Sequence, residues 1–387
     1  MPMSKLFTAF WAIVMLLALC SCAPSAQAPE QSPPPETAAQ PSAPAPTQTP
    51  EPTQVPEPTQ APMEIPLGET AKVGELACGR ELYRYRGQDV SRLYYYYIPS
   101  TYQAGERLPL MLTLHGSGSN ASIQLQWGDW VSLAEREGFI VVAPEAVTIH
   151  RDGALSSEGK SVLETGQTDF NYIRWNVSYT DPCAQYLVDD VAYLTDLVDL
   201  FVDAGYADPQ RAYCCGMSHG GFMSLRLAVE APEKFAGVAS VAGLLCAEYA
   251  AQLPAQPVRV VFIQGSQDPV VPIGGMHYDF DNDGEQEYTW ALSLDESAAW
   301  FVQRSGASDE AEYSQLPDAA PNDGTRISRY AYCAGQTPQV VKYVVEGGGH
   351  TWPGGTAYAG SGPVSLDAQA SQLIWAELRD AVRQDDS

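Results

Sequence analysis

Ser218 lies in the sequence Gly-Met-Ser-His-Gly, which spans residues 216–220. An apolar run that ends at Cys215 precedes this sequence, and an amphipathic stretch, Phe222–Phe235, follows it. A G-x-S-x-G sequence between a strand and a helix is typical of a nucleophile elbow, a tight turn that exposes the serine hydroxyl at the edge of a sheet. We therefore expect Ser218 to be a nucleophile. The alternative is a Gly/Ser turn that caps a helix.

A serine hydroxyl attacks readily only when a base removes its proton and an acid orients that base. After a nucleophile elbow, the acid and then the histidine follow along the chain. His350 comes after an apolar strand pattern, Val340–Val345, and three glycines, whereas His277 lies in an acidic, polar stretch. We favour His350 as the base, because a strand followed by a glycine loop can deliver an imidazole over the edge of a sheet. The alternative is a loop histidine packed beside Trp352.

The candidate acid follows another strand pattern. Apolar residues cover Val258–Ile263, a glycine stands at position 265, and Asp268 comes three residues later. Pro269 and Pro272, which follow it, stiffen the loop. We expect Asp268 to orient His350. The alternative is a turn aspartate that accepts hydrogen bonds from its own backbone.

An acyl-transfer site also needs two backbone N–H groups that point to the developing negative charge. The residue after the nucleophile, His219, is expected to donate one of them. The apolar run Leu108–Leu114 ends in His-Gly-Ser-Gly-Ser-Asn, a small polar loop. We expect Ser117 in this loop to donate the second amide, with Gly118 as the alternative.

Four segments together resemble the polyhydroxybutyrate depolymerase and feruloyl-esterase-like family, which is related to carbohydrate esterase family 1. They are LHGSGSN, DPQRAYCCGMSHGG, GSQDPVVP and GGGHTWPGG, and the resemblance runs from about Gly74 to the C-terminus. It implies an α/β-hydrolase fold and hydrolysis of carboxylic esters through an acyl-enzyme, without a cofactor. By position, it implies that Ser218 is the nucleophile, Asp268 the orienting acid and His350 the base.

The chain departs from this family at places that would shape the substrate pocket. His219 stands where such enzymes often have asparagine, an acidic insert follows Asp268, and a polar stretch covers residues 149–166. The substrate therefore stays open. Feruloyl or acetyl esters of plant cell-wall polysaccharide are our first expectation, and short polyhydroxyalkanoate chains are the second.

Strand and helix patterns alternate along the globular part, which predicts a mostly parallel sheet with helices on both faces. Ligands of such sheets bind beyond the carboxyl ends of the strands, where the three candidate residues fall. The strand patterns are Arg92–Ile98, Leu110–Leu114, Phe139–Ala143, Arg211–Cys215, Val238–Val241, Val258–Ile263 and Val340–Val345, and the helical patterns are Ser122–Glu137, Tyr186–Ala204, Gly220–Ala231, Leu292–Ser305 and Ser365–Val382.

The first 66 residues predict export and tethering. Lys5 and the apolar run after it are typical of a signal peptide, residues 1–21. The sequence Leu-Cys-Ser-Cys-Ala around Cys22 resembles a bacterial lipobox, with Cys22 lipidated and the protein held on the outer side of the cell membrane; the alternative is an ordinary cleaved signal. Residues 22–66 are rich in Pro, Thr and Gln and predict an extended linker. Residues 67–387 remain as the esterase domain.

The formal net charge is −26, which argues against a nucleic-acid partner, because phosphates would be repelled. In an exported chain, the six cysteines after the lipobox suggest disulfides, although fifteen full pairings are possible. Neighbouring Cys214 and Cys215 should point to opposite faces of a strand. The six cysteines are Cys78, Cys183, Cys214, Cys215, Cys246 and Cys333.

Two further features are weaker. Asp279, Asp281 and Asp283 match the first half of a calcium loop, but position twelve would be tryptophan instead of glutamate; a solvated acidic turn is the alternative. Trp175 and Trp352 are candidates for substrate contact, and ordinary packing is the alternative.

The sequence thus predicts a secreted, lipid-anchored serine esterase. A hypothesis of another class is a non-catalytic glycan- or solute-binding lipoprotein, against which the intact Ser–Asp–His set argues.

Overall fold

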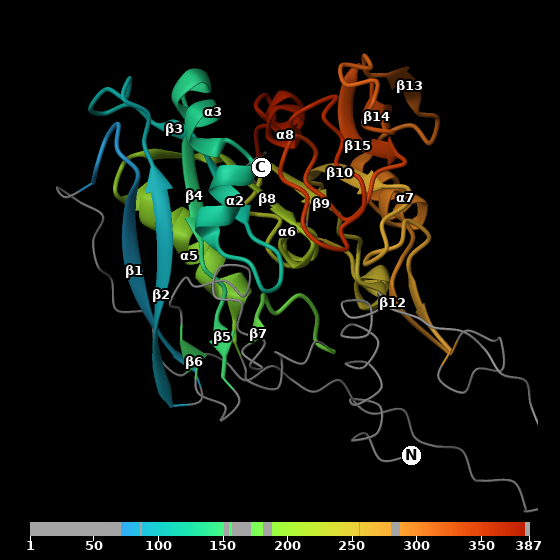
Figure 1. The fold of residues 1–387 in the computed structure, drawn as a ribbon. Coiled ribbons are helices and arrows are strands. Elements are labelled where there is room, and N and C mark those ends of the chain that lie inside the picture. The colour runs from blue at the N-terminus through green and yellow to red at the C-terminus, as the bar shows by residue number, and fades with distance from the viewer. Residues whose placement is uncertain are drawn as a thin grey trace, which may run out of the picture. The chain divides into compact units, whose positions relative to one another are not determined.

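A sheet of ten strands runs through the centre of the molecule (Figure 1). Six neighbouring strands in the middle of the sheet, β4, β3, β8, β9, β10 and β15, are mutually parallel. The pairings that involve the two outermost strands on either side are antiparallel. In the order in which they pair, the strands are β1 (Ala77–Tyr85), β2 (Gln88–Tyr97), β4 (Ile140–Pro144), β3 (Leu108–Leu114), β8 (Ala207–Met217), β9 (Gly237–Val241), β10 (Arg259–Gly265), β15 (Thr337–Glu346), β14 (Arg326–Ala334) and β13 (Glu312–Gln315).

The structure is a computed structural model that describes residues 71–85, 87–150, 155–156, 172–180, 188–254, 256–279 and 287–383. The predicted signal peptide (1–21), the predicted lipidation site Cys22 and the predicted linker (22–66) lie outside the described residues. Within the described ranges, no helix combines the length and the apolar character needed to cross a bilayer.

Helices cover both faces of the sheet, which confirms the expected α/β-hydrolase arrangement. Three of them, α5 (Asp190–Asp203), α6 (His219–Glu230) and α7 (Leu294–Ser305), pack on one face. The other face carries α2 (Ala121–Trp127), α3 (Trp130–Glu137) and α8 (Ala370–Leu378).

Residues of the central strands alternate between the two cores, as pleating requires. Leu110 and Leu112 of β3 face the α5–α7 side, and Met111 between them faces the α2–α8 side. The neighbouring cysteines of β8 obey the same rule, with Cys214 in the first core and Cys215 in the second. Their predicted opposite orientation is therefore confirmed.

No disulfide joins the described cysteines, Cys78, Cys214, Cys215, Cys246 and Cys333. The expected cross-links are therefore absent among these five, and Cys183 lies outside the described residues. Cys214 and Cys215 are instead small buried core side chains.

Two small sheets extend beyond the carboxyl ends of the parallel strands, at the lower side of Figure 1. One joins β5 (Thr148–Ile149), β6 (Leu155–Ser156) and β7 (Tyr172–Ile173), and follows directly after β4. The other is a hairpin of β11 (Met276–Tyr278) and β12 (Tyr288–Ala291). Both therefore lie near the edge at which the sequence places its candidate residues.

All seven predicted strands are present, but some elements differ from their patterns. The predicted helix Ser122–Glu137 is two helices, because Asp129 adopts a left-handed φ of 47° that no α-helix can continue. The predicted helix Ser365–Val382 is shortened to nine residues, α8. The outer strands β1, β13 and β14 were not predicted, because one-sided burial gives edge strands a mixed apolar pattern.

Candidate active site

Ser218 occupies a strained turn between β8 and α6. Its backbone has φ 54° and ψ −120°, a combination that residues with a side chain rarely adopt. The Ser218 amide donates a hydrogen bond to the carbonyl oxygen of Val241, 2.8 Å away, so the neighbouring strand β9 holds the turn in place. Such strain persists only where the surroundings enforce it, and it gathers at functional sites.

The glycines on either side of Ser218 are required because neighbouring backbone atoms leave no room for a side chain there. A Cβ atom on Gly216 would lie 2.4 Å from the Gly220 carbonyl, and one on Gly220 would lie 2.3 Å from the Leu114 oxygen. Any other residue at these two positions would force the strand and the helix apart. The sequence interpretation of a nucleophile elbow therefore has a steric basis in this turn.

The candidate acid and base are hydrogen-bonded to each other. Nδ1 of His350 lies 2.8 Å from Oδ2 of Asp268, and both side chains are buried. Because an ionised carboxylate can only accept, Nδ1 must carry the hydrogen, which leaves Nε2 of the neutral ring as an acceptor. This tautomer is the one that a general base for a serine needs.

Asp268 is itself held firmly. Its Oδ1 atom accepts from the amides of Val270 and Val271, each at 2.8 Å, and its Oδ2 atom also accepts from Nε2 of Gln264 at 3.1 Å. Both sequence interpretations of this residue therefore apply at once. Oδ1 orders the turn, and Oδ2 accepts from both Gln264 and His350.

The glycine loop before His350 crosses the end of β10 at close range. A Cβ atom on Gly265 would lie 2.4 Å from the oxygens of Gly348 and Gly349. The amide of His350 donates to the carbonyl of Ser361 at 2.6 Å, which fixes the far side of the loop. The ends of β10 and β15 thus bring Asp268 and His350 together.

The loop after β3 lies against Ser218. A Cβ atom on Gly116 would be 3.4 Å from the Cβ atom of Ser218. The amide of Gly118 is occupied, since it donates to the Ile173 carbonyl at 2.8 Å, whereas that of Ser117 donates to no partner within the described part of the chain. This favours Ser117 over Gly118 as an oxyanion donor. His219 begins α6, where the first amides of a helix have no intrahelical partner.

The side chain of His219 contacts a cation that sequence reasoning did not single out. Nη2 of Arg174, in the segment that follows β7, donates to Nε2 of His219 at 2.9 Å. Burial and then the Arg174 charge hold the pKa of His219 well below its usual value of 6.5, and the charge of His350 acts in the same direction. His219 is therefore neutral, and it links the nucleophile turn to the segment around Arg174.

The two tryptophans proposed for substrate contact lie in the core instead. Trp175 is 0% exposed and its Nε1 donates to the His115 carbonyl at 2.8 Å. Trp352 is 1% exposed, and its Nε1 donates to Oε1 of Gln369 at 2.9 Å. The packing alternative describes both residues, because each indole is buried with its N–H satisfied.

The calcium hypothesis falls mostly outside the described residues. Asp279 is described, but Asp281 and Asp283 are not. In the ranges that the structure does describe, no three His, Cys, Asp or Glu side chains are grouped so as to hold a metal ion.

The depressed pKa of His219 predicts a pH-dependent stability. Below pH 6.5 the unfolded chain binds a proton at this residue and the folded chain does not, so the free energy of unfolding should fall as pH falls, by up to ~1.4 kcal/mol per pH unit. His219→Asn should remove this contribution. Urea unfolding of both proteins at pH 7 and pH 5 measures it, and an identical pH dependence would show that His219 takes up its proton in the folded state.

Comparison with known proteins shows which family the chain matches. A family model described as "Putative esterase" matches residues 91–352, more than half of the chain. "Putative esterase NocK" of Nocardia uniformis subsp. tsuyamanensis is 35% identical over 256 residues, which are 65% of this chain and 67% of that protein.

Two further relatives are similar over shorter parts. "Poly(3-hydroxybutyrate) depolymerase" of Ralstonia pickettii is 32% identical over 160 residues, 38% of this chain and 28% of that protein. "Bifunctional acetylxylan esterase/xylanase XynS20E" of Neocallimastix patriciarum is 25% identical over 186 residues, 48% of this chain and 23% of that protein. The matches therefore span less than a third of the length of these two relatives. With its family match and its sheet topology, the chain belongs to the esterase family and is a carboxylic ester hydrolase.

Proposed function

We propose that the ester is cleaved by a serine mechanism in which Ser218, His350 and Asp268 act together. The observation that carries this proposal is the 2.8 Å hydrogen bond between Asp268 and His350, at the same sheet edge as the strained turn of Ser218. Ser218 Oγ attacks the ester carbonyl carbon while Nε2 of His350 takes its proton. Asp268 stabilises the imidazolium that forms.

The second half of the reaction reuses the same groups. The tetrahedral oxyanion is stabilised by the amides of Ser117 and His219, and it collapses as the C–O bond to the alcohol breaks and His350 gives its proton to the leaving oxygen. Water then attacks the acyl-enzyme, again losing a proton to His350. The acid is released, and Ser218 regains its hydrogen.

The test is hydrolysis of a short p-nitrophenyl ester by the wild type and single variants. Ser218→Ala should lower kcat about a million-fold, and Asp268→Asn about ten-thousand-fold because it favours the wrong tautomer. Ser305→Ala at the end of α7, where the hydroxyl donates to the Val302 carbonyl and accepts from the Ala307 amide, is the matched control and should keep its rate. A fully active Ser218→Ala variant would overturn the mechanism. A folded wild type that neither turns over an ester nor reacts with a fluorophosphonate probe would support the binding-protein hypothesis.

For the substrate, we propose esters attached to a polysaccharide, acetyl or feruloyl. One support is the relative described as an acetylxylan esterase/xylanase. The other is a row of aromatic side chains beside the elbow. The ring of Phe222 on α6 lies 6.3 Å from that of His219 and 4.9 Å from that of Trp290 on β12.

The row continues to the surface. Tyr288 stands two residues before Trp290, on the same side of the strand, and is 38% exposed. Its hydroxyl lies 3.4 Å from that of Thr180, next to Tyr179, which is 47% exposed. Exposed aromatic faces at the outer end of a row that begins at the elbow suit stacking on the rings of an extended polysaccharide or of its ferulate groups. A hydroxyalkanoate chain, suggested by the depolymerase relative, has no ring and would gain less from them.

The aromatic row yields a discriminating measurement. Tyr288→Ala should lower kcat/KM for acetylated xylan and methyl ferulate about ten-fold, and leave that for p-nitrophenyl acetate and a hydroxybutyrate oligomer nearly unchanged. Tyr313→Ala removes an even more exposed tyrosine, but from β13 at the far edge of the sheet, and serves as the control. Equal losses on all four substrates would rule out a role in substrate choice.

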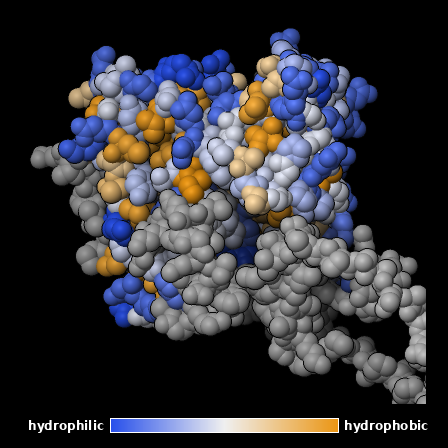
Figure 2. Space-filling view, in the orientation of Figure 1, coloured by the Kyte–Doolittle hydropathy of each residue, from blue (hydrophilic) through white to orange (hydrophobic). Residues whose placement is uncertain are grey.

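We also propose that the enzyme is exported and anchored by a lipid on Cys22, with a membrane as its second partner. The net charge of −26 supports an extracytoplasmic protein with no nucleic-acid partner. On the face shown in Figure 2, hydrophilic residues line the upper and right margins of the described part.

The anchor can be tested by labelling a bacterial host with a palmitate analogue. The wild type and Cys20→Ser should take up label, whereas Cys22→Ser should not, because only the first residue after the cleaved signal is modified. Label on the Cys22→Ser protein, or none on the wild type, would contradict the lipid anchor.

A further inference from the structure

We propose that His115 is a positioning residue for the oxyanion hole, because its imidazole fixes the direction of the Ser117 amide. This inference rests on the serine mechanism proposed above. His115 is the last residue before the loop that lies against Ser218, and its side chain is fully buried. It belongs to neither the nucleophile nor the acid–base pair.

The key contact is made by the ring of His115 with the next peptide along the chain. Nδ1 of His115 lies 2.8 Å from the carbonyl oxygen of Gly116. A carbonyl oxygen can only accept, so Nδ1 must carry the hydrogen. This Nδ1–H tautomer leaves Nε2 as an acceptor.

The carbonyl of Gly116 and the amide of Ser117 belong to one peptide unit. The described part of the chain contains no cis peptide bond, so this C=O and this N–H point in opposite directions in one plane. Gly116 O also accepts from the Ser119 amide at 3.1 Å. Two donors thus hold the carbonyl on one side of the loop and direct the Ser117 N–H to the other.

Three contacts hold His115 in the position from which its ring can donate to the Gly116 carbonyl. The amide of Ala146 donates to Nε2 of His115 at 3.1 Å, and Nε1 of Trp175 donates to the His115 carbonyl at 2.8 Å. The rings of Trp175 and His115 also pack with their centres 5.3 Å apart. A glycine loop that could otherwise rotate is thereby tied to β4 and to the segment after β7.

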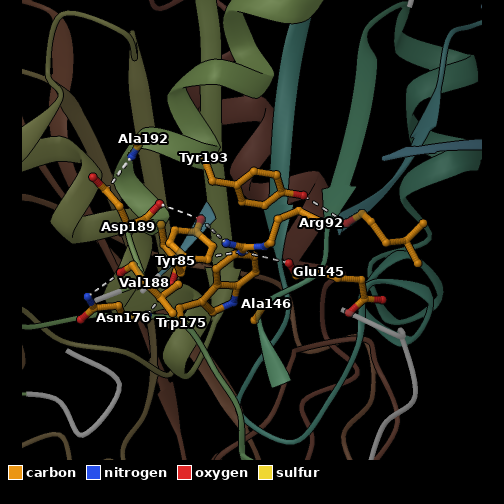
Figure 3. A network of polar contacts seen from close by, with 12 residues as sticks. Tyr85, Arg92, Glu145, Ala146, Trp175, Asn176, Val188, Asp189, Ala192 and Tyr193 are labelled. Carbon is orange, nitrogen blue, oxygen red and sulfur yellow. Dashed lines mark hydrogen bonds and ion pairs between the residues drawn. The ribbon is translucent and has the colours of Figure 1, made fainter. Parts of the chain in front are cut away.

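These contacts belong to a larger buried network, and Figure 3 shows the part of it around Arg92, Glu145 and Trp175. Glu145, which precedes Ala146, accepts from the Ala121 amide through Oε1 at 3.0 Å. The carbonyl of Glu145 accepts from Nη2 of Arg92 at 3.1 Å, and the same nitrogen forms a fully buried ion pair with Asp190 at 2.8 Å. Oε2 of Glu145 lies 3.4 Å from His115 Nε2, which the Ala146 amide already occupies.

Asp190 connects this network to the segment that contains Trp175. Its Oδ2 atom accepts from the amide of Asn176 at 2.6 Å, directly after the tryptophan. The guanidinium of Arg92 lies 5.9 Å from the centre of the indole ring, and Figure 3 shows the two side by side. Breaking an ion pair this deeply buried is strongly destabilising, so the frame around His115 is costly to disturb.

A pair of nearly matched variants separates the positioning contact from mere packing. Asparagine carries an N–H at the same number of bonds from Cα as His Nδ1, whereas glutamine carries its amide atoms at the position of Nε2. His115→Asn can therefore still donate to Gly116 O but loses the acceptor for Ala146. His115→Gln keeps that acceptor and loses the donor.

We expect His115→Gln to lower kcat for a p-nitrophenyl ester 10- to 100-fold with KM nearly unchanged, and His115→Asn to retain at least a third of the wild-type kcat. Loss of an entire oxyanion donor costs about 10²- to 10³-fold, and a misdirected donor costs less. A trifluoromethyl ketone, whose adduct with the serine places an oxyanion in the hole, should bind His115→Gln more weakly by the factor lost in kcat. Thermal unfolding of both variants provides the measure of packing damage.

Each outcome decides the proposal. Equal losses of kcat in both variants, or a full rate in His115→Gln, would overturn it. If neither variant folds, Trp175→Phe replaces them, since it removes the indole N–H that donates to the His115 carbonyl and keeps an aromatic ring beside His115. That variant should lose kcat and ketone affinity several-fold together, and unchanged values would overturn the proposal. A wild type without ester turnover would instead overturn the serine mechanism itself.

Discussion

The contact between β3, β8 and the start of α6 is the constraint on which the rest of the site depends. These elements approach so closely that Gly216 and Gly220 leave no space for a side chain, and the residue between them, Ser218, is forced to a positive φ. The continuation of β3 then passes Ser218 at van der Waals distance, through Gly116. One steric condition therefore positions both Ser218, the proposed nucleophile, and the loop that is proposed to stabilise the oxyanion.

Two strands away, the other half of the site also depends on a close backbone contact at a glycine. Gly265 at the end of β10 meets the glycine loop after β15 without room for a Cβ atom. Asp268 and His350 follow these two ends, so their hydrogen bond needs only short loops. Parallel strands end at one edge of a sheet, and close backbone approach at that edge converts four strand ends into one site.

This regularity is also why candidate site residues could be predicted from the sequence. Strand patterns followed by Gly, Ser, Asp or His are local features, and the parallel fold brings their ends together. Packing between segments that are distant in sequence produces no local sequence pattern. The break at Asp129, the burial of Trp175 and Trp352 and the contact of Arg174 with His219 depend on partners far along the chain. The only signal for Arg174 was its position next to a tryptophan in a polar region.

Trp175 illustrates how one side-chain type can serve two purposes. A tryptophan beside a sugar-ester site suggests a stacking platform, but a buried indole N–H needs an acceptor, and Trp175 finds one in the carbonyl of His115. Its contact is therefore with the backbone at the start of the loop that lies against Ser218. The aromatic surface left for a substrate is that of Tyr179 and Tyr288, whose rings reach solvent. The exposure of the ring, more than its distance in sequence from Ser218 or His350, thus distinguishes the two kinds of aromatic residue. Buried Trp175 supports the structure around the site, whereas Tyr179 and Tyr288 are available to contact an ester.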